Sequence, residues 1–223
     1  MVFIRQEMIF LKGAIFDIDG TILDSMAAWI ETTNKFFKSH GVNISEEKAL
    51  SYQTMSFEES LSQIQHDYLP HIDTAKMLGE FSRLYKEECE NGILPKPYAV
   101  EYIKSLHDKG VKLAVATSGF PDIVKKSFTR LGIYDYFDAF AFSSEVGCSK
   151  SNPDIYLLAA KRLGLKPCEC TVYEDILTGI KSAGAAGFKT VAIEDISNAS
   201  DKQGLIQHSD RYITGWSELL SNI

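Results

Sequence analysis

The chain has little of what would place it on a nucleic acid or in a membrane. Its 23 lysines and arginines are outnumbered by 30 aspartates and glutamates, giving a net charge of −7, whereas nucleic-acid binding through counterion release requires a basic surface. No apolar run approaches the ~20 residues that span a bilayer, and residues 1–8 lack the apolar core and cleavage site of a secretory signal. We therefore expect a cytoplasmic protein without nucleic-acid or membrane partners.

Cysteine is also scarce. The four cysteines are scattered along the chain, and Cys168-x-Cys170 lacks the second pair that a structural zinc site needs. Reduced thiols are the expected state of all four.

Length and composition fit an ordinary globular protein. The composition, 45% apolar and 24% charged, is that of a soluble globular chain. The length of 223 residues is enough for one large domain or for a domain with a sizeable insertion. The sequence contains no internal repeat and no low-complexity segment.

The most informative stretch is a pair of acids behind an apolar run. Residues 9–16 are mostly apolar and predict a buried strand, and Asp17 and Asp19 follow it directly. Alternate residues of a strand face the same side, so both carboxylates can face one point, where a cation would relieve their repulsion. A polar strand end followed by an Asp-Gly turn is the alternative for this motif alone. Met8 is a possible internal start, because the strand needs nothing before it.

The rest of the chain divides into two parts. Residues 26–92 show helical spacing of apolar residues and no convincing strand. After the stiff segment 94–97, helices alternate with strands. The expected helices are at 99–109, 121–131, 153–163 and 177–186, and the expected strands at 111–116, 139–142, 170–173, 189–193 and 211–214. This alternation is typical of βαβ units, in which ligands bind at the carboxyl ends of parallel strands.

Polar residues follow several of these strands. They are Asp17 and Asp19, Thr117 and Ser118, Lys150 a little further from its strand, and Glu174 and Asp175. Taken singly, each has an ordinary explanation as a helix cap or a solvated surface residue. Their joint placement at strand ends is harder to explain in that way and predicts one shared crevice.

In these motifs the chain resembles the haloacid dehalogenase-like hydrolase superfamily, in the branch with an inserted helical cap that includes β-phosphoglucomutase-like proteins. Four motifs carry the resemblance, in the family's order: Asp17-x-Asp19-Gly20-Thr21, Thr117, Lys150 and Glu174-Asp175. The resemblance covers nearly the whole chain. It implies an α/β fold with a three-layer Rossmann-like core and a parallel sheet, formed by residues 1–24 and 96–223, and a helical cap domain over residues 25–95.

The resemblance also implies an enzyme of phosphoryl transfer. Asp17 would attack phosphorus and form an aspartyl-phosphate, and Asp19 would act as general acid and then as general base. Mg²⁺ would be held by the Asp17 carboxylate, the Asp19 backbone carbonyl and Asp175, with a direct or water-mediated contact from Glu174. The groups that would hold the phosphoryl oxygens are the Thr117 hydroxyl, the Ser118 N–H and Lys150.

Departures from the family's patterns narrow the reaction. An acid at Asp19 points to C–O–P chemistry, because carbon–halogen and carbon–phosphorus cleavage need no proton donor of this kind. Trp29 and Phe57 stand where the mutases have a histidine and an arginine, which favours simple hydrolysis. A phosphomutase remains the alternative, with Arg83 or Lys86 as candidates to hold a distal phosphate.

We therefore expect a Mg²⁺-dependent phosphatase, monomeric or weakly dimeric, that acts on a small phosphorylated metabolite. A non-catalytic phosphate-dependent regulatory module is the alternative from another class, and a receiver domain fits worse because it is about half this length. Trp29, Tyr52, Met55 and Phe57 are interpreted as cap core more than as cavity lining.

Overall fold

A six-stranded parallel sheet organises the computed structural model, which describes the chain except for residues 1–10, 53–54, 56, 91 and 221–223. The strand order is β3-β2-β1-β4-β5-β6. The strands are β1 (Gly13–Phe16), β2 (Lys112–Thr117), β3 (Ala139–Phe142), β4 (Cys170–Glu174), β5 (Lys189–Ile193) and β6 (Arg211–Ile213). The predicted α/β class with a parallel sheet is confirmed, with β1 near its centre.

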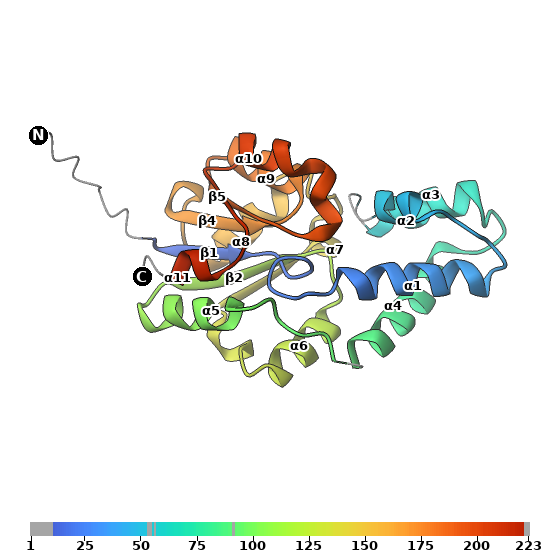
Figure 1. Ribbon diagram of the computed structural model, residues 1–223, viewed down its shortest axis with the longest axis horizontal. Coiled ribbons are helices and arrows are strands. Elements are labelled where there is room, and N and C mark those ends of the chain that lie inside the picture. The colour runs from blue at the N-terminus through green and yellow to red at the C-terminus, as the bar shows by residue number, and fades with distance from the viewer. Residues whose placement is uncertain (1–10, 53–54, 56, 91, 221–223) are drawn as a thin grey trace, which may run out of the picture.

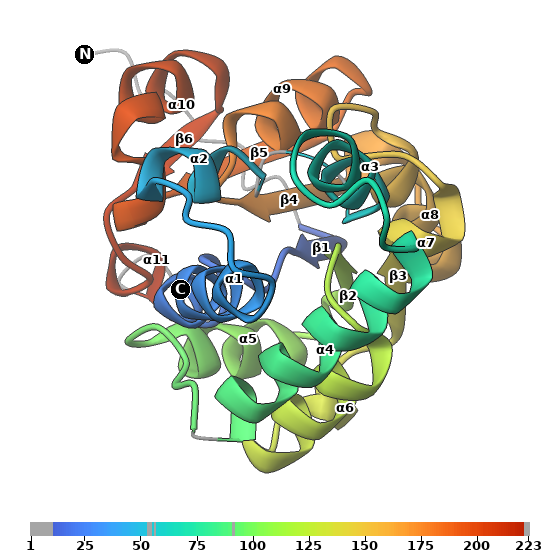
Figure 2. The same cartoon turned by 90° about the vertical axis from the view of Figure 1, so that its right-hand side faces the viewer.

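Helices cover both faces of this sheet and make it a three-layer structure (Figure 2). One face carries α5 (Ala99–Asp108), α6 (Pro121–Arg130) and α11 (Ser217–Leu220), with the 3₁₀ turn η2 (Tyr134–Tyr136). The other carries α8 (Asp154–Leu163), α9 (Leu177–Ala185) and α10 (Lys202–His208), with the short helix α7 (Ser143–Val146) and the 3₁₀ turns η3 (Pro167–Glu169) and η4 (Ile196–Asp201). Strands buried on both faces explain the near-continuous apolar runs in the sequence.

The side chains of β1 show how the two faces are filled. Phe16 lies in the cluster shared with α5 and α11, where it stacks on Tyr173 at a ring-centroid distance of 4.6 Å. Its neighbour Ile15 lies in the other cluster, against α8, as the alternation of a strand requires. Trp216 extends the first cluster and donates from Nε1 to the Thr21 carbonyl at 3.1 Å. The segment that follows β1 is therefore anchored in the core.

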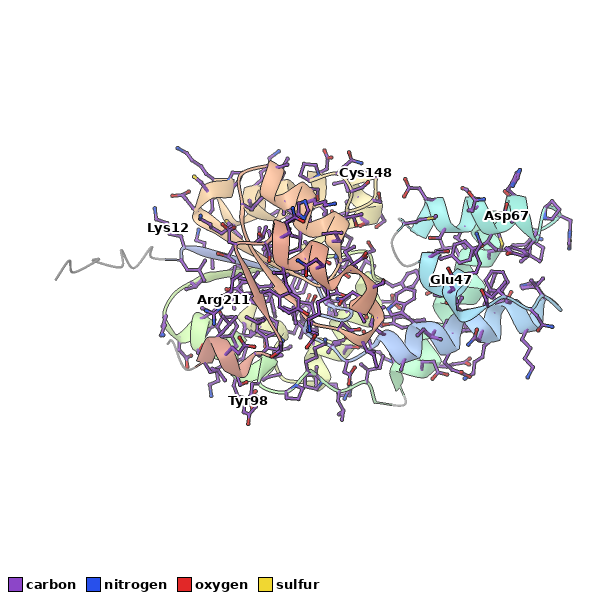
Figure 3. All side chains as sticks on the ribbon, turned by 45° about the horizontal axis from the view of Figure 1, so that its top comes forward. Lys12, Glu47, Asp67, Tyr98, Cys148 and Arg211 are labelled. Carbon is purple, nitrogen blue, oxygen red and sulfur yellow. The ribbon has the colours of Figure 1, made fainter. Side chains whose placement is uncertain are left out.

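Four further helices form a group set beyond the carboxyl end of β1 (Figure 1). This helical group consists of α1 (Met26–Ser39), α2 (Glu46–Ser51), α3 (Phe57–Asp67) and α4 (Thr74–Glu90). Its core includes the buried Phe36, Met77 and Phe81. Figure 3 shows Glu47 and Asp67 on this group, well apart from Lys12, just before β1, and from Arg211 in β6. The described part of residues 26–90 contains no strand, as expected.

Two adjacent chain segments connect the helical group to the sheet. Asp24 N–H donates to the Leu94 carbonyl at 3.0 Å, and Lys96 N–H donates to the Ile22 carbonyl at 2.8 Å. The Lys96 ammonium also forms an ion pair of 2.7 Å with the buried Asp195. The chain thus leaves the sheet and returns to it at neighbouring positions.

The sequence pattern does not predict four of the helical stretches: α7, the 3₁₀ turns η2 and η3, and η4 with α10. Asp195 begins η4 by accepting from Ser197 N–H at 2.9 Å, which is a local capping pattern. None of the helices in the described ranges combines the length and apolar character needed to cross a bilayer.

Candidate active site

Asp17 and Asp19 lie in a tight loop at the carboxyl end of β1. Asp17 N–H donates to the Tyr173 carbonyl at 2.9 Å, which continues the pairing with β4. Leu23 N–H donates back to the Ile18 carbonyl at 2.8 Å and closes the loop. Gly20 has a φ of +80°, and a Cβ there would lie 2.5 Å from Asp175 Oδ2. A glycine is therefore required both by the backbone and by the approach of Asp175.

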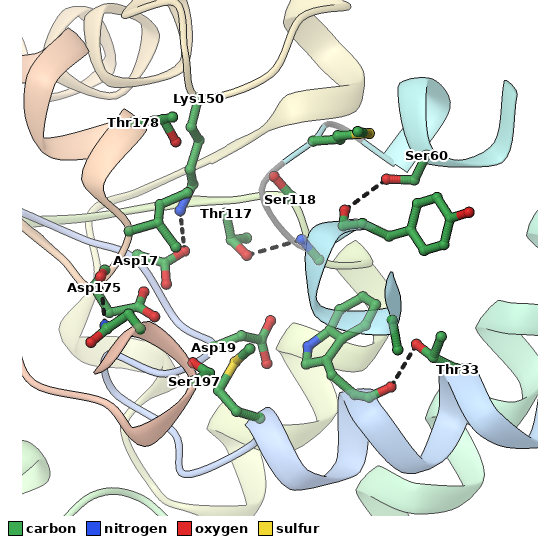
Figure 4. Close-up of a pocket in the computed structure, with 18 of the residues that line it drawn as sticks. Asp17, Asp19, Thr33, Ser60, Thr117, Ser118, Lys150, Asp175, Thr178 and Ser197 are labelled. Carbon is green, nitrogen blue, oxygen red and sulfur yellow. Dashed lines mark hydrogen bonds and ion pairs between the residues drawn. The ribbon is translucent and has the colours of Figure 1, made fainter. Parts of the chain in front are cut away.

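Lys150 reaches the same point from the turn between α7 and α8 (Figure 4). Its ammonium contacts Asp17 Oδ1 and lies 2.8 Å from Glu174 Oε2. Lys150 is 6% exposed, and its backbone carbonyl accepts from Ser182 Oγ at 2.6 Å. The structure thus brings Asp17, Lys150 and Glu174 together, as the strand-end argument predicted, and a solvated surface lysine is the wrong interpretation.

Thr117 and Ser118 line the same cavity at the end of β2. Thr117 Oγ1 accepts from Gly119 N–H at 2.9 Å, and Ser118 Oγ hydrogen-bonds Ser143 Oγ at 2.9 Å. A Cβ on Gly119 would lie 3.2 Å from Thr117 Oγ1. The turn is therefore compact, and Thr117 lines the cavity together with the acids.

Three buried acids form a cluster that fits a cation. Carboxylate oxygens of Asp17, Glu174 and Asp175 lie within 4.8 Å of one another. Asp175 Oδ1 accepts from Thr21 Oγ1 at 3.2 Å, while Asp175 Oδ2 is buried without a hydrogen-bond partner among the described residues. Buried polar atoms are normally paired, so this oxygen is a candidate ligand. An all-oxygen set of this kind suits Mg²⁺.

Glu174 holds Lys150 in place as well as adding charge. Its Oε2 receives both Lys150 and the Tyr156 hydroxyl, the latter at 3.0 Å. Its Oε1 accepts from Ile176 N–H at 3.3 Å. Tyr156, from α8, is fully buried. Because both of its carboxylate oxygens already have protein partners, Glu174 is better placed to hold Lys150 than to be a main ligand of a bound cation.

Burial and mutual repulsion control the protonation of these acids. Burial, followed by the Glu174 charge, raises the pKa of Asp17 to about 7, although Lys150 opposes the shift. Burial and the charges of Glu174 and Asp17 raise the pKa of Asp175 well above its usual range. For Lys150, burial lowers the pKa, but the Asp17 and Glu174 charges outweigh it and raise the pKa above its usual value. A bound cation would favour the charged form of the acids.

Asp19 has different surroundings. Its Oδ1 accepts from Ser25 Oγ and from the Tyr85 hydroxyl, each at 2.6 Å. Tyr85 belongs to α4 and lies 66 residues further along the chain. Burial, then the Asp19 charge and Cys89, raises the pKa of Tyr85 well above its usual value, so its hydroxyl keeps its proton. No short motif could have connected these residues.

The cavity extends from the acids into the helical group. Its lining there includes Trp29, Tyr52, Met55 and Phe81. Tyr52 is also buried core of the group, and the half-buried Trp29 stacks on Tyr85 at 4.3 Å. Trp29, Tyr52 and Met55 therefore both pack in the core of the helical group and line the cavity. The Phe57 side chain lies outside the described part of the structure.

The η4 segment completes the opposite wall. Ser197, Asn198 and Asp201 line the cavity, and Asn198 Nδ2 donates to the Asp175 backbone carbonyl at 2.6 Å. Asn198 thus holds the loop that carries Asp175. The sequence pattern does not predict η4, and so it gives no sign of this contribution.

Comparisons with known proteins agree with this geometry. Residues 14–193 match the haloacid dehalogenase-like hydrolase family. Hexitol phosphatase A of Escherichia coli is 30% identical over 91% of this chain and 93% of its own. Fructose-1-phosphate phosphatase YqaB of the same organism is 29% identical over 81% of this chain and 95% of its own.

Solved structures show the same fold at lower identity. CbbY from Rhodobacter sphaeroides, in complex with phosphate, superposes with a TM-score of 0.84 at 22% identity, covering 94% of this chain and 96% of that one. A putative β-phosphoglucomutase from Thermotoga maritima reaches 0.73 at 22% identity, covering 95% and 99%.

Proposed function

The chain belongs to the haloacid dehalogenase-like hydrolase family, and we propose that it is a phosphatase acting on a small phosphorylated metabolite such as a sugar phosphate. The observation that carries the proposal is the contact of the Lys150 ammonium with Asp17, beside the orphaned Asp175 Oδ2. A nucleophile, an anion-binding cation and a free metal ligand then converge on one cavity. Relatives named as hexitol phosphatase and fructose-1-phosphate phosphatase support the same proposed function.

Asp17 is the proposed nucleophile. One of its carboxylate oxygens forms a bond to phosphorus as the bond from phosphorus to the leaving oxygen breaks, which produces an aspartyl-phosphate. In the next step a water oxygen bonds to phosphorus and the bond to Asp17 breaks, which releases inorganic phosphate. Splitting the displacement in this way makes each step easier.

Asp19 is the proposed general acid and base. It gives a proton to the leaving alkoxide in the first step and takes a proton from the attacking water in the second. Thr117, the Ser118 N–H and Lys150 are proposed to hold the phosphoryl oxygens, where negative charge must be offset in the transition state. Tyr156 and Glu174 support Lys150 in this role through the hydrogen bonds described above.

Mg²⁺ is the proposed metal, held by the Asp17 carboxylate, the Asp19 backbone carbonyl and Asp175, with Glu174 nearby. When bound, it would neutralise part of the phosphoryl charge and fix the orientation of the phosphate. The unpaired Asp175 Oδ2 and the buried acid cluster support this assignment.

Residues 25–95 are proposed to act as a cap domain over a core of residues 1–24 and 96–223. The helical group lines the outer part of the cavity through Trp29, Tyr52 and Met55. A wall of this kind limits access of water and strengthens the electrostatic interactions inside. It also places the leaving group of the substrate against aromatic side chains.

Purified protein with Mg²⁺ and a panel of phosphorylated metabolites tests the proposal through release of inorganic phosphate. We expect turnover of at least one sugar phosphate and of a generic aryl phosphate, loss of both in EDTA, and recovery with Mg²⁺. Ca²⁺ should inhibit, because its coordination is looser and higher. Tight binding of a phosphorylated ligand without any turnover would favour the regulatory-module alternative, and full activity in EDTA would overturn the metal assignment.

A further inference from the structure

We propose that Tyr85 of helix α4 is a positioning residue that holds the Asp19 carboxylate for proton transfer and thereby makes the helical group part of the acid–base machinery. This inference rests on the proposed function, in which Asp19 is the general acid and base. It gives a role to Tyr85, which belongs to none of the sequence motifs.

Two neighbouring hydroxyl groups donate to the same carboxylate oxygen of Asp19, which leaves its other oxygen for proton transfer. Tyr85 and Ser25 both donate to Oδ1, each at 2.6 Å. The other oxygen, Oδ2, faces the loop that follows β2, since a Cβ on Gly119 would lie 3.6 Å from it. Two proposed phosphate-binding residues lie there, Thr117 at the end of β2 and Ser118 at the start of that loop. An oxygen that accepts two hydrogen bonds is a poor position for the acid proton, so the proton is carried on Oδ2, toward the phosphoryl group.

The Tyr85 hydroxyl is itself held firmly. Tyr85 is 3% exposed and stacks on Trp29 with ring centroids 4.3 Å apart and an interplanar angle of 29°. Trp29 packs in turn on Phe81 at 5.3 Å. Trp29 and Phe81 line the cavity, so one layer of packed rings lies between the Tyr85 ring and the space for the leaving group.

The hydrogen bond between Tyr85 and Asp19 also joins the helical group to the loop after β1. Ser25 stands at the start of α1, six residues from Asp19, whereas Tyr85 is on α4 and 66 residues away. Ser25 is therefore close to Asp19 through the chain itself, whereas the Tyr85 contact requires helix α4 to be packed against the strand ends. Correct orientation of the acid thus depends on the helical group being in place over the strand ends.

The proton balance defines what Tyr85 does and does not do. In the first step the Asp19 Oδ2 proton moves to the leaving alkoxide oxygen while the bond from that oxygen to phosphorus breaks. In the second step Asp19 takes back a proton from the water that attacks phosphorus. Tyr85 keeps its own proton throughout and acts only by fixing the rotation of the carboxylate, whose misplacement by ~1 Å can cost about 100-fold in rate.

Tyr85→Phe tests this role, because it removes the hydroxyl and leaves the ring stack. The two probes are 4-nitrophenyl phosphate, whose leaving group needs little protonation, and the alkyl phosphate that the wild-type protein hydrolyses fastest in a sugar-phosphate panel. The constant kcat/KM reports the steps up to release of the alcohol. We expect Tyr85→Phe to lower it about 10- to 100-fold with the alkyl substrate. The loss with the aryl substrate should be less than about threefold, since little protonation is needed there.

Two further variants separate positioning from general damage. Tyr102→Phe is the matched control, since it removes another buried tyrosine hydroxyl, hydrogen-bonded to Tyr173 at 2.7 Å, away from Asp19. It should leave the ratio of the two kcat/KM values unchanged. In an Asp19→Asn background, Tyr85→Phe should cause no additional loss with the alkyl substrate, because residues that act as a unit are not additive.

The outcomes distinguish this inference from the proposed function. Wild-type hydrolysis with a selective Tyr85→Phe loss supports both. Wild-type hydrolysis with equal losses for the two substrates, with no loss, or with full additivity in the Asp19→Asn background overturns the role of Tyr85 alone. Absence of phosphomonoester hydrolysis by the wild-type protein overturns the proposed function and this role with it.

Discussion

Lys150 and Glu174 form a buried ion pair of 2.8 Å in which the lysine side chain is 6% exposed and the glutamate side chain is not exposed at all. The same ammonium contacts Asp17, so one cation faces two carboxylates, with Asp175 close to both. The cluster therefore holds more negative than positive charge in a place with little water. Such an excess is costly unless an acid keeps a proton or a cation binds.

This charge excess predicts how stability depends on pH. The pKa of Asp17 is raised to about 7 by burial and by Glu174, so between pH ~4 and ~7 the folded chain keeps a proton that the unfolded chain releases. Without metal, this group's contribution to the free energy of unfolding is complete below pH ~4 and is lost as the pH rises through about 7. Mg²⁺, which competes with the proton, should raise the melting temperature more at about pH 8 than at about pH 5.

Thermal unfolding with EDTA or Mg²⁺ at the two pH values measures this effect. Asp17→Asn is the matched control, because it removes the titrating group at nearly constant volume, and its Mg²⁺ effect should be small at both pH values. A larger Mg²⁺ effect at the lower pH in the wild-type protein would contradict the assignment.

Asp17→Asn should also abolish turnover. An amide oxygen is too weak a nucleophile to form the aspartyl-phosphate, so the variant should neither hydrolyse substrate nor trap beryllofluoride as a phosphoryl analogue. Phosphate release and ¹⁹F NMR with Mg²⁺ measure the two losses. Appreciable residual turnover would mean that the covalent mechanism is wrong.

Asp19→Asn should have a smaller and different effect. We expect turnover of alkyl phosphates to fall by about 10²–10⁴-fold, the usual contribution of general acid–base catalysis. Binding of Mg²⁺ should be retained, because the proposed ligand from this residue is its backbone carbonyl. Calorimetric titration with Mg²⁺ checks the second point, and loss of metal binding would show that the Asp19 carboxylate is a ligand after all.

Hydrolysis should prevail over mutase activity. A mutase must hold a second phosphate while the intermediate survives, and each charge-assisted hydrogen bond to that phosphate contributes about 1.5–3 kcal/mol. The Trp29 ring stacks on Tyr85 and carries no charge, so bisphosphate retention should be weaker by one or more powers of ten, at ~1.4 kcal/mol per decade.

A direct assay for this prediction uses β-glucose 1-phosphate with a trace of the bisphosphate, followed by ³¹P NMR. Inorganic phosphate as the main product, or no reaction, agrees with a phosphatase. Efficient appearance of glucose 6-phosphate would contradict it and would direct attention to Arg83 or Lys86 as partners of the distal phosphate.

Much of the sheet and of the acid cluster could be predicted from the sequence, because both depend on local rules. Apolar runs of strand length alternate with helical patterns, and parallel strands bring their carboxyl ends to one edge. Asp17, Thr117, Lys150 and Asp175 meet for that reason, without any knowledge of side-chain packing. The expected strand over residues 9–16 proved shorter in the described part, where β1 begins at Gly13.

Contacts between distant side chains were decided only by the tertiary structure. Tyr85 reaches Asp19 across 66 residues, Tyr156 reaches Glu174 from another helix, and Asn198 holds the Asp175 carbonyl from a turn that the sequence pattern did not reveal. The rotation of each side chain and the placement of the helical group determine these distances, and neither leaves a periodic trace in the chain. The sequence by itself therefore determined which groups are available for chemistry, whereas packing decided which of their oxygens remain free to perform it.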